Sequence, residues 1–159
     1  QRENMSPSYK FVAYFFLLGC YSGLRFSDLQ RVHTGELVKG NRLVCATTKT
    51  GEIVSIPLTS KLRELLDYIG NKPLIANTHA NVYIKEIAKA AKLKEPKRVH
   101  FHLARHTFAT LSLELGIPIS TVQAILGHRN IRTTAIYAKV SNPLLNEAMD
   151  KWENLQKIA

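Results

Sequence analysis

Apolar residues recur at intervals of three and four along most of the chain, which predicts a mainly helical protein. Residues 8–20 are almost wholly apolar and predict a buried helix. Gly23 ends this segment, and a second short helix follows, for which Ser27 is the expected N-cap. The chain therefore opens with two helices separated by a glycine break.

The period changes to two between residues 42 and 57. RLVCAT at 42–47 and EIVSIP at 52–57 are short β-branched runs, separated by the polar residues TKTG. This pattern is typical of an antiparallel hairpin with a turn of a few residues. Pro57 suits the end of a strand, where no backbone donor is needed.

Helical periodicity resumes after the hairpin and continues to the end of the chain. Thr59 or Ser60 is the expected cap of the first of these helices, and Ser120 is the expected cap of the helix at 120–127. The expected helices cover residues 60–69, 81–91, 102–115, 120–127, 131–140 and 143–158. The predicted fold is mainly α with a small antiparallel β-hairpin or sheet, in the α+β class, and residues 1–159 form one domain.

Composition changes the picture through charge. The 22 Lys and Arg residues outnumber the 12 Asp and Glu residues, so the net charge is +10. Such an excess favours polyanionic partners, nucleic acid first, although ordinary solubilising charge is the alternative. The longest apolar run, 11–21, is too short to span a bilayer. Cys20 and Cys45 form neither a disulfide framework nor a zinc motif, which favours a reducing cytoplasm.

Cationic and proton-transfer residues recur where a helical core does not need them. His102 and Arg105 share a helix face at i and i+3, and Tyr137 follows His128 by nine residues. The candidate catalytic residues are Arg25, Lys49, His102, Arg105, His128 and Tyr137. Cations that stabilise phosphate oxygens, together with a hydroxyl nucleophile, suit phosphoryl transfer without a metal or other cofactor.

GLRFSDL, the hairpin KTGEIVSIPL, HLARHTFAT, LGH and IYAKV occur in an order that resembles the catalytic domain of tyrosine recombinases, the phage integrase family. The resemblance covers residues 23–140. It implies that Arg25 and Arg105 hold the scissile phosphate and that His128 donates a further hydrogen bond to it. Asp28 matches an acidic position that orients the active site, where many relatives have Glu.

The remaining roles follow from the same resemblance. Lys49 would enter the minor groove and act as general acid on the departing 5′ oxygen. His102 would contact the phosphate or accept the proton of the tyrosine. Tyr137 would attack the phosphorus and form a 3′-phosphotyrosyl bond. The resemblance implies a site-specific recombinase that integrates or excises a mobile element, independent of metal and ATP.

The resemblance also implies partners and a domain organisation. Residues 1–159 would be the C-terminal catalytic domain, with the N-terminal DNA-binding domain outside this chain. The partners would be double-stranded DNA and other recombinase subunits, assembled as a tetrameric synapse through the C-terminal segment 143–158. The expected location is the bacterial cytoplasm, associated with the nucleoid.

Simpler interpretations stand beside each assignment. Tyr137 alone is more often a core tyrosine, Lys49 a solubilising residue of a hairpin tip, and segment 143–158 a helix packed on its own core. Structural or surface roles are expected for the other histidines: His33, His79, His100 and His106. The competing functions are a non-catalytic DNA-binding regulator, a type IB topoisomerase and, least of all, a metal-dependent nuclease.

Overall fold

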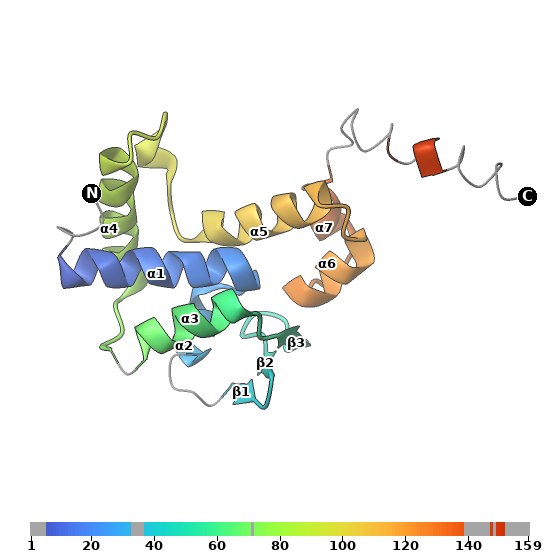
Figure 1. Cartoon of the computed structure of the whole chain (residues 1–159), viewed down its shortest axis with the longest axis horizontal. Helices are drawn as coiled ribbons and strands as arrows, with labels where there is room; N and C mark the ends of the chain where they lie inside the picture. Colours follow the sequence, from blue (N-terminus) through green and yellow to red (C-terminus); the bar gives the residue numbers. More distant parts are fainter. Residues whose placement is uncertain (1–5, 33–36, 71, 139–146, 148, 152–159) are drawn as a thin grey trace, which may run out of the picture.

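The computed structural model describes residues 6–32, 37–70, 72–138, 147 and 149–151, and it is mainly helical (Figure 1). The helices of this part are α1 Pro7–Ser22, α2 Phe26–Val32, α3 Ser60–Ile69, α4 Asn77–Ala90, the 3₁₀ helix η1 Pro96–Arg98, α5 His102–Glu114, α6 Ile119–Leu126 and α7 Arg132–Ala135. The strands are β1 Val38–Lys39, β2 Arg42–Ala46 and β3 Ile53–Pro57. The predicted fold class is therefore confirmed. Within the described residues, no helix has the length and apolar character needed to cross a lipid bilayer.

Helix α1 is the centre of the core and packs against α3, α4 and α5. Its Phe15 ring is fully buried and lies 5.5 Å from the ring of Phe26 and 5.6 Å from that of Phe101. The Phe26 and Phe101 rings meet edge to face at 4.9 Å. Since Phe26 directly follows Arg25 and Phe101 directly precedes His102, this aromatic cluster fixes the chain beside two candidate site residues.

The sheet is antiparallel, in the order β1-β2-β3. In the predicted hairpin, Cys45 pairs with Val54 and Leu43 with Ile56, and these four side chains are buried on one face. The intervening positions face outward, as the period of two predicts. Strand β1 was not predicted, because two residues carry no periodic signal. The hairpin tip, residues 47–52, points toward the end of α6.

Some predicted helix ends are confirmed and others are wrong. Thr59 caps α3 by accepting a hydrogen bond from the Leu62 amide at 3.2 Å. Ser27 and Ser120 are not caps. Helices α2 and α6 each begin at the residue before the serine, so the serine lies inside the first turn. Helix α4 begins at Asn77 and not at the predicted residue 81. The prediction missed its first turn because that turn is polar and carries no apolar periodicity.

The C-terminal predictions fall partly outside the described residues. The helix expected over 131–140 is wrong in length, since α7 covers only Arg132–Ala135 and Tyr137 follows it in a turn. Residues 139 and 140 lie outside the described part. Of the helix expected over 143–158, the structure describes only 147 and 149–151, which are helical.

The end of α6 touches the hairpin closely at Gly127. This glycine has φ +62°, and a Cβ added there would lie 3.0 Å from Thr47 Cγ2 and 3.0 Å from Val54 Cγ1. Both neighbours are β-branched side chains with little freedom to move away. A glycine is thus required twice at this position, by its left-handed backbone and by the close approach of the hairpin.

Replacing Gly127 should therefore cost more stability than replacing a left-handed glycine in open space. Gly116 has φ +78° and nothing within 4 Å of an added Cβ, so it is the matched control. We expect Gly116→Ala to lower the free energy of unfolding by about 1–2 kcal/mol, from backbone strain alone. Gly127→Ala should lose about 1–3 kcal/mol more, from overlap with the hairpin. Urea denaturation of both variants measures the difference, and equal losses would contradict the close packing.

Candidate active site

Arg105 is the hub of the site, and its side chain is only 2% exposed. It lies on α5, and its Nη1 donates to the carbonyl oxygen of Gly23 at 2.8 Å. Its Nη2 donates to the carbonyl oxygen of Leu126 at 2.6 Å and lies 2.8 Å from Nε2 of His128. Burial lowers the pKa of Arg105 to about 10, with Arg25 adding to the shift, so the guanidinium stays charged at neutral pH. One buried cation thus joins the end of α1, helix α5 and the end of α6.

The hydrogen bonds of His128 define its tautomer. Arginine has donors only, so Nε2 of His128 accepts from Arg105. The ring proton is then on Nδ1, which donates to Thr134 Oγ1 at 2.8 Å. Burial first, and then the charges of Arg105, Arg25 and His102, lower the pKa of His128 to about 4. The ring is therefore neutral at neutral pH.

Arg25 lies between Gly23 and the start of α2. Its Nη1 is buried and has no hydrogen-bond partner. The Arg25 charge is close enough to contribute to lowering the pKa of Arg105, of His128 and of Tyr137. A buried donor without a partner is costly, and in a native structure it often marks a place where a ligand atom binds. The charges of Arg25 and Arg105 thus act on the same two side chains, His128 and Tyr137.

Asp28 connects α2 to the hairpin. Its side chain is fully buried, and Oδ1 accepts from the backbone amide of Thr48 at 2.8 Å and from Thr48 Oγ1 at 2.7 Å. Lys49 is the next residue, and it lies exposed at the tip of the hairpin. Asp28 therefore holds the backbone that carries Lys49, as the expected orienting role requires.

Tyr137 lies half-buried in the turn after α7, against a small apolar cluster that includes Phe108 and Leu126. Its ring is 5.2 Å from the ring of His106, which in turn lies 4.5 Å from the ring of His102. Burial raises the pKa of Tyr137, while Arg105 and Arg25 lower it in opposition. The pKa values of both histidines are lowered, first by desolvation and then by neighbouring positive charge. Both rings are therefore neutral at neutral pH.

The structure brings most of the predicted residues together. Those linked by contact or electrostatic interaction are Arg25, Asp28, His102, Arg105, His128 and Tyr137. Lys49 is held nearby through its backbone neighbours. His106 was not expected near the site, because a residue next to Arg105 points about 100° away on the helix, yet its ring lies against that of Tyr137. The one signal in the sequence was a second histidine four residues after His102.

The arrangement suits an anion that carries several oxygens. Three of the five N–H groups of Arg105 are used in the bonds to Gly23, Leu126 and His128, and the guanidinium keeps its charge. The unpaired Nη1 of Arg25 adds another donor. A tyrosine hydroxyl and two neutral imidazoles stand beside these donors. Within the described residues, no group of three or more His, Cys, Asp or Glu side chains is arranged to hold a metal ion.

Comparison with known proteins identifies relatives over nearly the whole chain. The model of the phage integrase family matches residues 3–143. A tyrosine recombinase of Pseudothermotoga lettingae is 33% identical over 145 residues, which cover 82% of this chain and 50% of the relative. The tyrosine recombinase XerA of Saccharolobus solfataricus is 34% identical over 131 residues, which cover 79% and 45%. The chain thus spans about half the length of these relatives.

The fold is also similar to that of a solved recombinase. The crystal structure of the XerH site-specific recombinase, bound to a palindromic difH substrate after cleavage, superposes with a TM-score of 0.70. The match has 20% sequence identity and covers 96% of this chain and 48% of that protein. This likeness confirms the expected fold class.

The two arginines should differ sharply in their contribution to stability. Arg105→Met leaves the carbonyl oxygens of Gly23 and Leu126 without donors, so the free energy of unfolding should fall by about 2–6 kcal/mol, at about 1–3 kcal/mol for each buried group. Arg25→Met removes a buried donor that has no partner, so stability should stay unchanged or rise. Urea denaturation measures both variants. Equal losses would show that Arg25 also has a structural role.

The stability of the chain should depend on pH through His128. Its pKa of about 4 lies below its ordinary value of 6.5, so between these values the unfolded chain binds more protons than the folded chain. The free energy of unfolding should therefore fall as the pH drops from 6.5 toward 4. His102 and His106 contribute with the same sign.

Urea midpoints measured across this pH range check the effect. His128→Gln should reduce the pH dependence, while His79→Gln, at an exposed position of α4, is the control and should leave it unchanged. An unaltered pH dependence in His128→Gln would contradict a neutral His128 in the folded chain.

Proposed function

Because the chain belongs to the phage integrase family, we propose that it is the catalytic domain of a site-specific tyrosine recombinase. The enzyme cleaves and rejoins double-stranded DNA through a covalent 3′-phosphotyrosyl intermediate. The observation that carries this proposal is the convergence of two arginine cations on Tyr137. The buried Nη1 of Arg25 has no partner and is available for the scissile phosphate, and the charges of Arg25 and Arg105 both act on the tyrosine hydroxyl.

In the cleavage step, the Tyr137 oxygen attacks the scissile phosphorus and the bond to the 5′ oxygen breaks. Arg25 and Arg105 stabilise the negative charge that builds up on the non-bridging oxygens. Lys49 donates a proton to the departing 5′ oxygen, which leaves as a free hydroxyl. The products are a 3′-phosphotyrosine and a 5′ hydroxyl, so atoms and charge balance once the tyrosine proton has been accepted.

The proton of Tyr137 passes to the histidines beside it. His106 lies against the Tyr137 ring, and His102 lies against His106. Their lowered pKa values keep both rings neutral at neutral pH, as a proton acceptor requires. The role of proton acceptor, expected for His102, is thus shared with His106.

His128 donates to a phosphate oxygen only after its tautomer changes. In the DNA-free chain its Nε2 accepts from Arg105 and its proton is on Nδ1. When the phosphate takes over the Arg105 donor, the proton can move to Nε2, and the Thr134 hydroxyl changes from acceptor to donor. A threonine hydroxyl serves both states without moving.

Rejoining reverses the chemistry. The 5′ hydroxyl of the same strand or of a partner strand attacks the phosphotyrosine and releases Tyr137. One phosphodiester is exchanged for another, so the cycle needs neither ATP nor a metal ion.

The substrate and partners belong to the same proposal. The net charge of +10 favours DNA. Other subunits bind in a tetrameric synapse through segment 143–158, most of which lies outside the described residues. A DNA-binding domain N-terminal to this one completes the enzyme, and the biological outcome is integration or excision of a mobile element.

Covalent capture tests the chemistry. The chain is mixed with nicked duplexes of random sequence at low salt in EDTA, and protein-linked DNA is isolated under denaturing conditions. We expect a nucleotide adduct that peptide mass spectrometry places on Tyr137. Tyr137→Phe should abolish the adduct and keep DNA binding, because only the nucleophilic oxygen is removed.

Tyr83→Phe, in α4, is the matched control and should form the adduct normally. An adduct that persists in Tyr137→Phe contradicts the nucleophile. No adduct from the unsubstituted chain, with DNA binding retained, favours a non-catalytic DNA-binding regulator. In a parallel assay on a covalently closed supercoiled plasmid, relaxation without strand exchange favours a type IB topoisomerase.

A further inference from the structure

The hairpin tip that carries Lys49 is bonded to α2 on one side. Asp28 accepts two hydrogen bonds from Thr48, the residue before Lys49. Arg31 Nη1 donates to the carbonyl oxygen of Ala46 at 2.6 Å, where β2 ends. These contacts fix the β2 side of the tip relative to the segment that carries Arg25.

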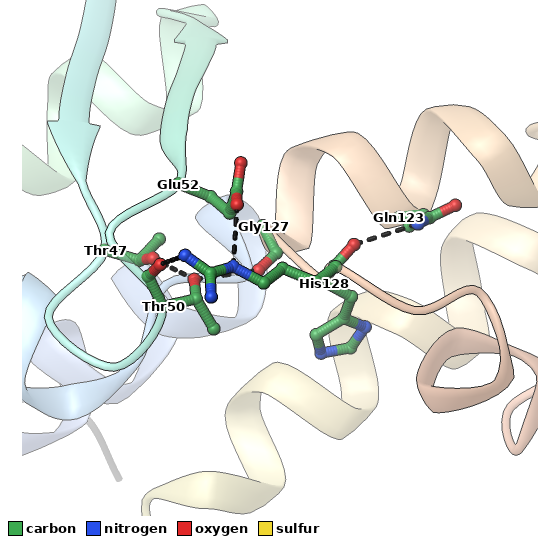
Figure 2. A network of polar contacts seen from close by, with 7 residues as sticks. Thr47, Thr50, Glu52, Gln123, Gly127 and His128 are labelled. Atoms are coloured by element: carbon green, nitrogen blue, oxygen red, sulfur yellow. Dashed lines mark hydrogen bonds and ion pairs between the residues drawn. The ribbon is translucent and has the colours of Figure 1, made fainter.

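The β3 side of the tip is hydrogen-bonded to the loop after α6. Thr50 Oγ1 donates to the carbonyl oxygen of Gly127 at 3.2 Å and lies 2.6 Å from Thr47 Oγ1. Arg129 Nη2 donates to the carbonyl oxygen of Thr50 at 2.5 Å, and its Nε donates to Glu52 Oε1 at 2.9 Å. Figure 2 shows this network, with Thr47, Thr50 and Glu52 facing the segment that contains Gly127 and His128.

The Arg129 contacts are too exposed to contribute much stability. The Arg129 and Glu52 side chains are 69% and 46% exposed, and a surface ion pair contributes about 0–1 kcal/mol. The geometry of these contacts is nevertheless specific, because one guanidinium binds the backbone of Thr50 and the side chain of Glu52 at the same time. A planar fork with several fixed donors can do this, whereas an ammonium group is a single point charge.

The position of these bonds in the chain gives them a catalytic consequence. Arg129 directly follows His128, and Thr50 directly follows Lys49. His128 is in turn held by Arg105 and, through its backbone carbonyl, by Gln123 Nε2 at 2.9 Å. Arg129 therefore joins the hairpin tip that carries Lys49 to the loop that carries His128.

We propose that Arg129 is a positioning residue that holds the hairpin tip against the His128 loop, so that Lys49 reaches the leaving 5′ oxygen. The inference rests on the proposed function, and it adds a residue that acts through Lys49 without touching the substrate. The bond network on the α2 side fixes Lys49 relative to Arg25. The Arg129 network fixes it relative to His128.

A change of leaving group tests this role. In a substrate whose bridging 5′ oxygen is replaced by sulfur, the leaving thiolate needs no protonation, because a thiol is far more acidic than an alcohol. Arg129→Ala should cleave the oxygen substrate about 10-fold more slowly, a part of the 10²–10⁴-fold that a general acid contributes, and should cleave the sulfur substrate at nearly the normal rate. Lys49→Ala should show the same pattern with a larger loss.

Two further variants sharpen the comparison. Arg98→Ala removes the same charge and an exposed ion pair of the same 2.9 Å length, with Glu95. It should leave the ratio of the two cleavage rates unchanged. Arg129→Lys restores one donor and should recover part of the rate on oxygen. Equal losses of Arg129→Ala on both substrates, or no loss, would overturn the inference.

Hydrogen exchange in the DNA-free chain gives a readout independent of activity. The amides of Thr47 and Gly51 are bonded within the tip, to Glu52 O at 2.9 Å and Thr47 O at 2.8 Å. Arg129→Ala should accelerate their exchange, and Arg98→Ala should not. Unchanged exchange in Arg129→Ala contradicts this inference, whereas absence of an adduct from the unsubstituted chain contradicts the proposed function, so the two failures are distinguishable.

Discussion

The burial of the Arg105 guanidinium is the constraint on which the rest of the structure depends. A cation removed from water is costly unless its donors are satisfied. Here backbone carbonyls at the C-terminal ends of α1 and α6 accept hydrogen bonds from the guanidinium. One is Gly23 itself, and the other is Leu126, directly before Gly127. Both glycines have left-handed backbones and close neighbours that leave no room for a side chain. The bonds that assemble α1, α5 and α6 are therefore the same bonds that place the cation for which we propose phosphate binding.

Local signals in the sequence predicted the elements that local forces determine. The left-handed glycines ended the helices where expected, and the alternation over 42–57 predicted the hairpin. Serines were a poorer guide, because Ser27 and Ser120 suit a first turn as well as a cap. The early start of α4 and the shortness of α7 depend on packing and turn geometry that apolar spacing does not encode.

Motif order predicted most of the site, since residues that share one chemistry must meet in the fold. The contacts between elements were beyond reach of the sequence. His106 points away from Arg105 on α5, yet the turn after α7 brings Tyr137 to that face. The pairing of Asp28 with Thr48 and of Arg129 with Thr50 depends on how the hairpin docks between α2 and the end of α6. Such long-range packing sets the positions of Lys49 and Tyr137.

An unpaired donor beside a satisfied one explains why the site can exist before DNA binds. Arg105 is fixed by three bonds and contributes to the fold, whereas the buried Nη1 of Arg25 has no partner and makes the DNA-free site less stable. In the proposed mechanism, a phosphate oxygen that binds this nitrogen removes the penalty. A phosphate that also displaces His128 from Arg105 would favour the tautomer that donates to the phosphate. Ligand binding would thus relieve the cost of Arg25 and prepare His128 in one event.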